Sequence, residues 1–261
     1  MPIITLTTDM GLKDYYVGVL KGAILKELPE TNIIDISHEI EPFNMQEAAF
    51  AIKNAYQEFP DKTVHLIGVD PDAGEDIDHV AIEENGHFFV GADNGMFALI
   101  FDRPPSKVVD LNIRQQSEFL TFPSKDIFVP AACHLARGGT LEVLGKPKKS
   151  LRQMILFNPT FENNSIIKGL VTHVDSYNNV ITNITKRDFQ EFGRGRKFMI
   201  CFRDDQYNIT EIHNTYSDAP EGSMMAIFGA TGFLEITVNK GKASKLLGLK
   251  FQEPIRVEFY D

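Results

Sequence analysis

Residues 1–157 alternate between short apolar runs and longer segments in which apolar residues recur every three or four positions. Short apolar runs are typical of buried strands, and the wider spacing is typical of amphipathic helices. We predict strands at 3–8, 32–36 and 64–69, and helices at 15–28 and 44–59. Strands that alternate with helices favour a mostly parallel sheet sandwiched between helices, so this half is predicted to be an α/β domain.

Polar residues refine the limits of these elements. Asn44 and Glu47 have the spacing of a capping box at the start of the second helix. Asp126 is a candidate N-cap for a further helix. Between the apolar runs 79–83 and 87–90, the dipeptide Asn85-Gly86 predicts a hairpin with a type I′ turn.

The pattern changes near Asn158, where turn-forming residues accumulate. Beyond this point short strand patterns follow one another with little helical periodicity, at 166–174, 180–184, 197–203, 208–212, 224–228, 234–238 and 255–259. A series of short strands of this kind favours a small antiparallel β-barrel or sandwich. We therefore predict two domains, residues 1–157 and residues 165–261, and clefts between domains are favoured ligand sites.

Composition narrows the class of protein. A net charge of -10 over 261 residues argues against nucleic-acid binding, because phosphate contacts require clustered Lys and Arg. The longest basic cluster, Lys146 to Lys149, is interpreted as a solvated loop. No apolar stretch reaches the ~20 residues that span a bilayer, and no signal peptide is evident. Cys133 and Cys201 form no paired motif, so we expect buried free thiols in a reducing cytoplasm and no metal site.

Two carboxylates stand directly after predicted strands, Asp9 after the first and Asp70 after the third. Open α/β sheets bind ligands at the carboxyl ends of their strands. For a single aspartate the commoner role there is to cap a helix or form a turn. Two at the same sheet edge favour a small-molecule site for cationic or hydroxyl-rich ligands.

Two further segments combine aromatic and polar residues. In residues 119–126, Phe122 and Ser124 precede a helix N-terminus, which suits an anion or polar ligand but equally a plain cap. In residues 174–179, Tyr177 and Asn179 suit a purine, although a simple β-turn accounts for the same residues. The seven histidines lack metal-ligand spacing, and no P-loop, GxGxxG or GxSxG motif is present.

An ordered series of motifs resembles one known family. The motifs are Thr7-Thr8-Asp9-Met10-Gly11, Asp35-Ile36-Ser37-His38-Glu39-Ile40-Glu41-Pro42-Phe43, Val69-Asp70-Pro71, Asp93-Asn94-Gly95, Thr121-Phe122 with Asp126-Ile127-Phe128, Asn179-Val180-Ile181-Thr182-Asn183-Ile184 and Gly232-Phe233-Leu234-Glu235-Ile236. Together they resemble the S-adenosylmethionine hydroxide adenosyltransferases, the family that also contains the fluorinases and chlorinases. The resemblance runs nearly end to end.

The resemblance implies a homotrimer whose ligand lies between the α/β domain of one subunit and the β-barrel domain of the next. Family members displace methionine from the ribose 5′ carbon of S-adenosylmethionine with water or halide. The implied substrate contacts are Asp9 with the ribose hydroxyls, Phe43 against the ligand, Phe122 and Ser124 beside the nucleophile, Asp175 at the methionine end, Tyr177 and Asn179 at the adenine, and Tyr216 as an aromatic wall. S-adenosylmethionine is the substrate, and no cofactor is implied.

The chain also departs from the family pattern. The hydrolytic members surround the water with an Asp, an Arg and a His, and here Asp70 is kept while Ile77 or Asp78 replaces the Arg and Pro123 replaces the His. Lys125, His79 and His87 are the candidates to replace the lost groups. The turn that binds the amino acid reads Gly229-Ala230-Thr231, where an Asn-Ser sequence is usual.

Three functions follow from these residues. The first is slow hydrolysis of S-adenosylmethionine to adenosine and methionine, with Asp70 as the catalytic base, because positioned acid–base help contributes ~10²–10⁴-fold. The second is binding of S-adenosylmethionine or a nucleoside without turnover. The third is halide transfer, suggested by Ser124 but opposed by Asp70, since a carboxylate ~4 Å from a halide costs roughly 1 to 4 kcal/mol.

Overall fold

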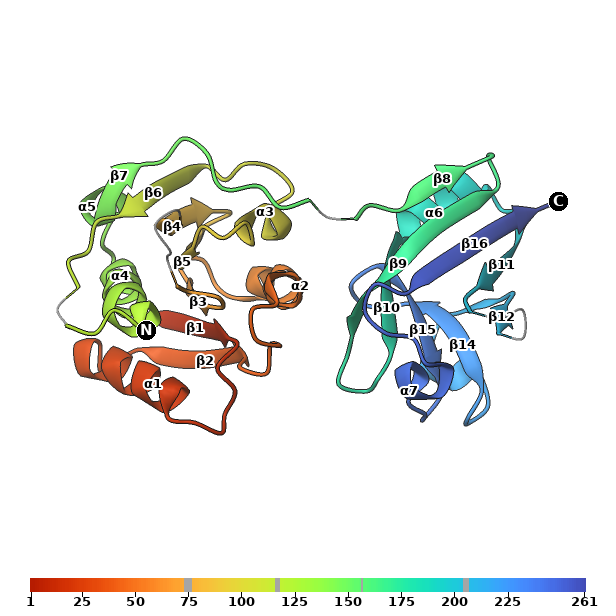
Figure 1. Ribbon diagram of the computed structural model, residues 1–261, viewed down its shortest axis with the longest axis horizontal. Coiled ribbons are helices and arrows are strands. Elements are labelled where there is room, and N and C mark those ends of the chain that lie inside the picture. Colours follow the sequence, from red (N-terminus) through yellow and green to blue (C-terminus); the bar gives the residue numbers. More distant parts are fainter. Residues whose placement is uncertain (73–76, 116–117, 156, 204–206) are drawn as a thin grey trace. The chain divides into compact units, whose positions relative to one another are not determined.

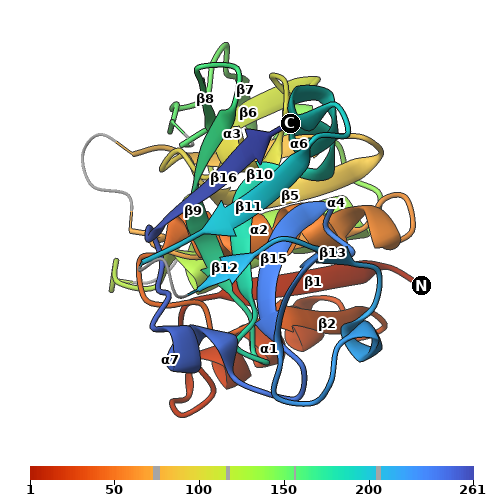
Figure 2. The ribbon, with the colours of Figure 1, turned by 90° about the vertical axis from the view of Figure 1, so that its right-hand side faces the viewer.

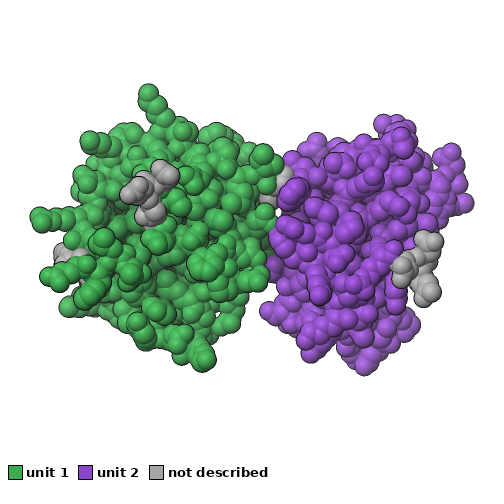
Figure 3. Space-filling view, viewed as in Figure 1, with its two compact units in different colours: residues 1–155 green, residues 156–261 purple. Residues whose placement is uncertain are grey.

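The computed structural model describes residues 1–72, 77–115, 118–155, 157–203 and 207–261 (Figure 1). The chain divides into two compact units, residues 1–155 and residues 156–261, coloured separately in Figure 3. Each unit has its own sheet and its own apolar core. The fold is therefore mixed α/β with two sheets.

The first unit contains a seven-stranded sheet in the order β2-β1-β3-β5-β4-β6-β7. Its elements are β1 (Ile3–Thr8), α1 (Tyr16–Glu27), β2 (Asn32–Ser37), α2 (Met45–Ala55), η1 (Tyr56–Glu58), β3 (Val64–Gly68), β4 (His79–Glu84), β5 (His87–Ala92), α3 (Phe97–Ile100), β6 (Lys107–Leu111), η2 (Ser124–Phe128), α4 (Val129–Ala136), α5 (Leu141–Leu144) and β7 (Gly145–Pro147). The predicted strands and helices of this unit are thus present.

The sheet is less parallel than the sequence pattern predicts. Strands β2, β1, β3 and β5 pair in parallel, whereas β5–β4, β4–β6 and β6–β7 pair antiparallel. The tight turn after β4 causes this change, because a hairpin reverses the chain. Asn85 and Gly86 in that turn have φ values of 50° and 81°, which confirms the type I′ prediction.

Helices cover both faces of this sheet (Figure 1). Ile4 and Leu6 of β1 pack with buried residues of α1 and α4 on one face. Ile67 of β3 and Phe89 of β5 pack with α2 and α3 on the other. Because both faces are buried, the carboxyl edge of the parallel strands is the part of the sheet that can present polar groups to a ligand.

The second unit is a nine-stranded sheet in the order β12-β11-β16-β9-β10-β15-β14-β13, with β8 paired to β9. Its elements are β8 (Thr160–Glu162), β9 (Ile166–Val174), β10 (Val180–Thr185), α6 (Lys186–Gly193), β11 (Lys197–Cys201), β12 (Asn208–Ile209), β13 (Ile212–His213), η3 (Tyr216–Asp218), β14 (Met224–Phe228), β15 (Phe233–Val238), α7 (Ala243–Leu247) and β16 (Pro254–Tyr260). In Figure 2, β16 lies between β9 and β11. Strand β12 at one end of the order contacts β14 near the other, so the sheet is nearly a barrel.

Several local predictions need correction. The second unit contains helices α6 and α7, and Thr185 with Asp188 forms a complete capping box at the start of α6. Asp126 is not an N-cap, because the helical turn begins earlier, at Ser124. Asn44 does cap α2 by accepting a hydrogen bond from the Glu47 backbone N–H at 3.1 Å, but the Glu47 carboxylate accepts from the Glu41 N–H instead of closing the box.

Within the described residues, every helix is too short or too polar to cross a bilayer. Cys133 and Cys201 are both buried and form no disulfide, as the sequence predicts.

Candidate functional site

One oxygen of Asp9 joins two loops at the carboxyl edge of the first sheet. Asp9 Oδ2 accepts hydrogen bonds from the backbone N–H of Phe43 at 3.0 Å and of Asp70 at 3.2 Å. Phe43 and Asp70 have φ values of 67° and 42°, in a region of backbone conformation that residues other than glycine rarely adopt. Asp9 therefore holds both loops in conformations that the chain alone would disfavour.

The Asp70 carboxyl lies half-buried beside this junction. Burial raises its pKa above the usual range, and the charges of Asp9 and Asp72 raise it further. Among the residues that the structure describes, no cation forms an ion pair with Asp70. A carboxylate with a raised pKa and no bound partner is suited to accept a proton.

Ser124 approaches the same strand end. It is fully buried, and its Oγ has no hydrogen-bond partner among the described residues. A Cβ placed on Gly68 would lie 2.8 Å from Ser124 Oγ, so the hydroxyl sits against the end of β3, two residues before Asp70. The first unit thus brings together Asp9, Phe43, Asp70 and Ser124. Phe122 precedes Ser124 by two residues, and its ring meets Tyr16 edge-on with centroids 5.5 Å apart. We call these four residues and Phe122 the first set.

The second unit holds the remaining predicted residues, Asp175, Tyr177, Asn179 and Tyr216, which we call the second set. Asp175 fixes Asn179: its Oδ1 accepts from the Asn179 backbone N–H at 2.8 Å and its Oδ2 from the Asn179 side-chain amide at 2.9 Å. The Asn179 Oδ1 accepts from the hydroxyl of Thr237 on β15. These bonds therefore hold the Asn179 amide rigidly in a buried position, while the neighbouring Tyr177 is 80% exposed.

The sequence analysis did not identify Glu235, which contacts Tyr216 of the second set. The Tyr216 hydroxyl donates to Glu235 Oε2 at 3.0 Å, and Glu235 is only 5% exposed. Burial raises the pKa of Glu235, and burial together with Glu235 raises the pKa of Tyr216 to about 12. A Cβ on Gly229 would overlap Glu235 Oε1, so a larger residue here would push the Glu235 carboxylate aside. The sequence signal that could have identified Glu235 is an acidic residue at an inward position of an otherwise apolar strand.

Lys148 corrects the interpretation of residues 146–149 as a solvated loop. Its side chain is 17% exposed, and its Nζ lies 2.5 Å from Asp78, 3.0 Å from Asp110 and 3.5 Å from Asp93. Burial lowers the pKa of Lys148, but the carboxylates of Asp78 and Asp110 raise it by more, so the net shift is upward. Lys148 thus supplies a cation beside Asp78, which is one of the two alternatives, with Ile77, for the position where the family Arg is expected. It is 70 residues away in the sequence, so local spacing could not identify it.

Three side chains were predicted as candidates to replace the family Arg and His, and each of them has another partner. Lys125 pairs with Asp126 at 2.6 Å. His79 Nε2 lies 3.1 Å from the Pro71 carbonyl oxygen. His87 Nδ1 lies 3.3 Å from Nε2 of the buried His65. Among the contacts of the described residues, His79 is the one of these three that touches the segment carrying Asp70.

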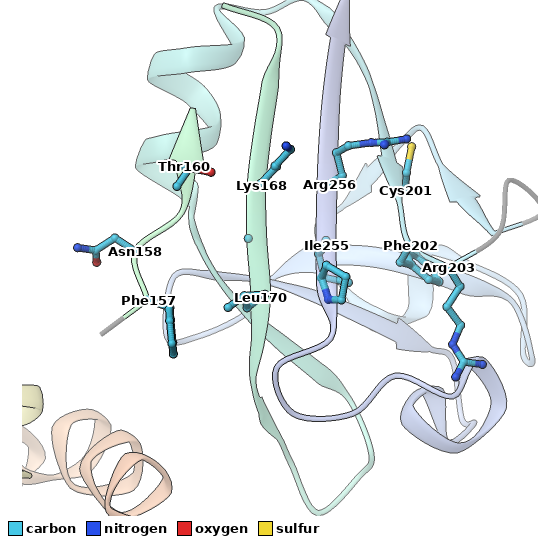
Figure 4. A pocket seen from close by; sticks show the side chains of 12 residues that line it. Phe157, Asn158, Thr160, Lys168, Leu170, Cys201, Phe202, Arg203, Ile255 and Arg256 are labelled. Atoms are coloured by element: carbon cyan, nitrogen blue, oxygen red, sulfur yellow. The ribbon is translucent and has the colours of Figure 1, made fainter. Parts of the chain in front are cut away.

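A separate cavity of about 490 Å³ lies on the second unit (Figure 4). Its lining contains none of the predicted site residues. Two of its cations are already paired, Lys168 with Glu162 at 2.7 Å and Arg256 with Glu258 at 2.7 Å. We therefore do not assign the predicted ligand to this cavity. Over the described ranges, no three His, Cys, Asp or Glu side chains lie close enough to hold a metal ion.

Comparison with known proteins identifies the family of this chain. The sequence models of the SAM hydroxide adenosyltransferase N-terminal and C-terminal domains match residues 4–145 and 169–256. The chain belongs to the S-adenosylmethionine hydroxide adenosyltransferase family, as the motifs predict.

Three relatives illustrate the range of this similarity. The "(R)-S-adenosyl-L-methionine hydrolase" of Methanocaldococcus jannaschii is 30% identical, over 98% of this chain and 96% of that protein. A crystal structure of an uncharacterized conserved protein from Thermotoga maritima, 31% identical, aligns over 98% of this chain and 99% of its own with a TM-score of 0.89. The fluorinase of Nocardia brasiliensis is 24% identical, over 98% of this chain and 97% of its own.

Proposed function

We propose that this protein hydrolyses S-adenosylmethionine to adenosine and methionine. The observation that carries the proposal is the Asp70 carboxyl, half-buried, with a raised pKa and without a cation partner among the described residues, at the strand end that Ser124 also contacts. The greater identity to a relative named as a hydrolase than to one named as a fluorinase supports water as the nucleophile.

The reaction needs only one base. The water oxygen bonds to the ribose 5′ carbon while the bond from that carbon to sulfur breaks, and its electron pair returns to sulfur. Methionine leaves as a neutral thioether, so no acid is needed to protonate it. Asp70 orients the water and accepts its proton, and its charge attracts the sulfonium cation.

The other residues supply binding in this proposal. In the first set, Asp9 accepts from the ribose hydroxyls, Phe43 packs on the ligand, and Phe122 and Ser124 line the side from which water attacks. In the second set, Asp175 faces the methionine end, and Tyr177 and Asn179 meet the adenine. Tyr216 is the aromatic wall. We propose a cytoplasmic homotrimer in which each site takes the first set from one subunit and the second set from its neighbour.

The direct test is product analysis after incubation with S-adenosylmethionine. We expect adenosine and methionine in equal amounts from the wild type and at least ~10²-fold less of each from Asp70→Ala, since a positioned base contributes ~10²–10⁴-fold. Asp61→Asn is a matched control, because Asp61 precedes β3 at the opposite end from Asp70, and it should retain wild-type turnover. Tight binding without product would indicate a binding protein, and 5′-chloro-5′-deoxyadenosine formed only with chloride would indicate a halide transferase. Either result contradicts the proposal.

A further inference from the structure

The backbone around Asp70 is held by side chains from three other parts of the chain: the loop after β1, the loop after β5 and the start of β4. Its N–H donates to Asp9, as described above. Its carbonyl oxygen accepts from Asn94 Nδ2 at 3.2 Å, and the carbonyl of the preceding Val69 accepts from the same Nδ2 at 3.2 Å. The next carbonyl, that of Pro71, lies 3.1 Å from His79 Nε2.

Asn94 is the central anchor of this segment. A side-chain amide carries two N–H donors, so one Nδ2 can serve both carbonyls at once. Its Oδ1 accepts from the Met96 backbone N–H at 3.2 Å, which fixes the orientation of the amide. Asn94 is only 7% exposed, so water cannot readily replace these bonds if the side chain is removed.

The conformation of Asp70 explains why an anchor is needed. With φ at 42°, Asp70 lies in the left-handed region, where a residue other than glycine is strained and persists only when its surroundings hold it. Among the described residues, the side chains that hold this segment are Asp9, Asn94 and His79. Without them the carboxylate would point in several directions.

We propose that Asn94 is a positioning residue, which orients the Asp70 carboxylate toward the attacking water through the Val69 and Asp70 carbonyl groups. This inference rests on the proposed hydrolysis. It predicts that Asn94 acts on the rate of the chemical step and not on substrate binding, because Asn94 is not among the residues proposed to contact the substrate.

The test compares Asn94→Ala with Asn94→Leu, which keeps the side-chain shape but removes both donors. We expect kcat to fall at least tenfold in each variant, while KM and the Kd for adenosine change less than twofold. Asn54→Ala is the control: its amide also donates to a backbone carbonyl, that of Phe50 at 2.8 Å, but within helix α2, and its kcat should not change. If Asn94→Ala fails to fold, Asn94→Leu is judged by the same criteria.

A double-mutant cycle separates positioning from a general structural role. In an Asp70→Ala background, with the residual rate measured at high enzyme concentration, adding Asn94→Ala should cause no further loss of kcat. An unchanged kcat in the single variant, the same tenfold loss in the Asp70→Ala background, or loss of adenosine binding would each overturn the inference.

Failure of the proposed function would be recognised separately, because the wild type itself would then form no adenosine. In that case hydrogen exchange decides the positioning claim. The Asp70 amide should be protected in the wild type and exchange at least tenfold faster in Asn94→Leu, and equal exchange would overturn it.

Discussion

The triple ion pair of Lys148 gives the sharpest stability prediction. Lys148 contacts Asp78, Asp93 and Asp110. Asp78 immediately precedes His79 and Asp93 immediately precedes Asn94, and His79 and Asn94 are two of the side chains that hold the Asp70 segment. The Asp93 backbone N–H also donates to the Asp78 carbonyl at 2.8 Å. Replacing Lys148 by Met keeps the aliphatic stem and removes only the charge and donors.

The expected loss of stability in Lys148→Met comes mainly from Asp93, the buried one of its three partners. Side chains of Asp78 and Asp110 are 60% and 42% exposed, and solvent screening limits such pairs to about 1 kcal/mol or less each. Asp93 is only 6% exposed, and stranding a buried charge costs about 3–5 kcal/mol. The Arg152 backbone N–H, 2.9 Å from Asp93 Oδ1, offsets part of that cost. We therefore expect Lys148→Met to lose about 3–5 kcal/mol.

Urea unfolding followed by circular dichroism measures this change. Lys53→Met is the matched control, because Lys53 forms a single exposed pair with Asp102, and it should lose less than about 1 kcal/mol. The loss in Lys148→Met should persist in high salt, since a largely buried pair is screened less than a surface pair. A loss below about 1 kcal/mol would refute the assignment of Lys148 as a structural cation.

Three further predictions concern pH and the second set. Burial, with the charge of a neighbouring histidine, lowers the pKa of His65 to about 3, whereas an unfolded histidine titrates near ~6.5. The unfolded state thus binds the extra proton, so the free energy of unfolding should fall by about 1.4 kcal/mol per pH unit below ~6.5. Urea unfolding at a series of pH values measures this dependence, which should be shallower in His65→Phe. The same pH dependence in both proteins would contradict the prediction. Because burial raises the pKa of Asp70, kcat should decline on the acid side with an apparent pKa above ~3.9, and a decline centred at or below that value argues against Asp70 as the base. Gly229→Ala should displace the Glu235 carboxylate from the Tyr216 hydroxyl. The loss of one hydrogen bond of about 1 kcal/mol should weaken binding of S-adenosylmethionine about fivefold, which calorimetry measures. Unchanged affinity would show that this contact does not shape the site.

Local sequence signals predicted most of the elements of this fold. The strand 3–8, the turn at Asn85-Gly86 and the N-cap Asn44 depend on residues within a few positions of one another, and all three are present. The helix α6 could also have been found, since Thr185 and Asp188 have capping-box spacing. It was missed because its apolar residues are few and lie among charged neighbours.

The site was predictable only in part, because its contacts join distant positions. Strand-end placement identified Asp9 and Asp70 as neighbours at one sheet edge, and the hydrogen bond between them is present. The resemblance to a family, not the spacing, singled out Tyr216. Neither approach could show that Lys148 pairs with Asp78, since no local pattern links a lysine to a carboxylate 70 positions away.

The central claim is that water, assisted by Asp70, attacks the ribose 5′ carbon. The most direct measurement is a reaction in ¹⁸O-labelled water, followed by mass spectrometry of the nucleoside product. We expect adenosine with one ¹⁸O in its 5′ hydroxyl, formed at least ~10²-fold faster by the wild type than by Asp70→Ala. Unlabelled adenosine, or labelled adenosine formed equally fast by the variant, would contradict it.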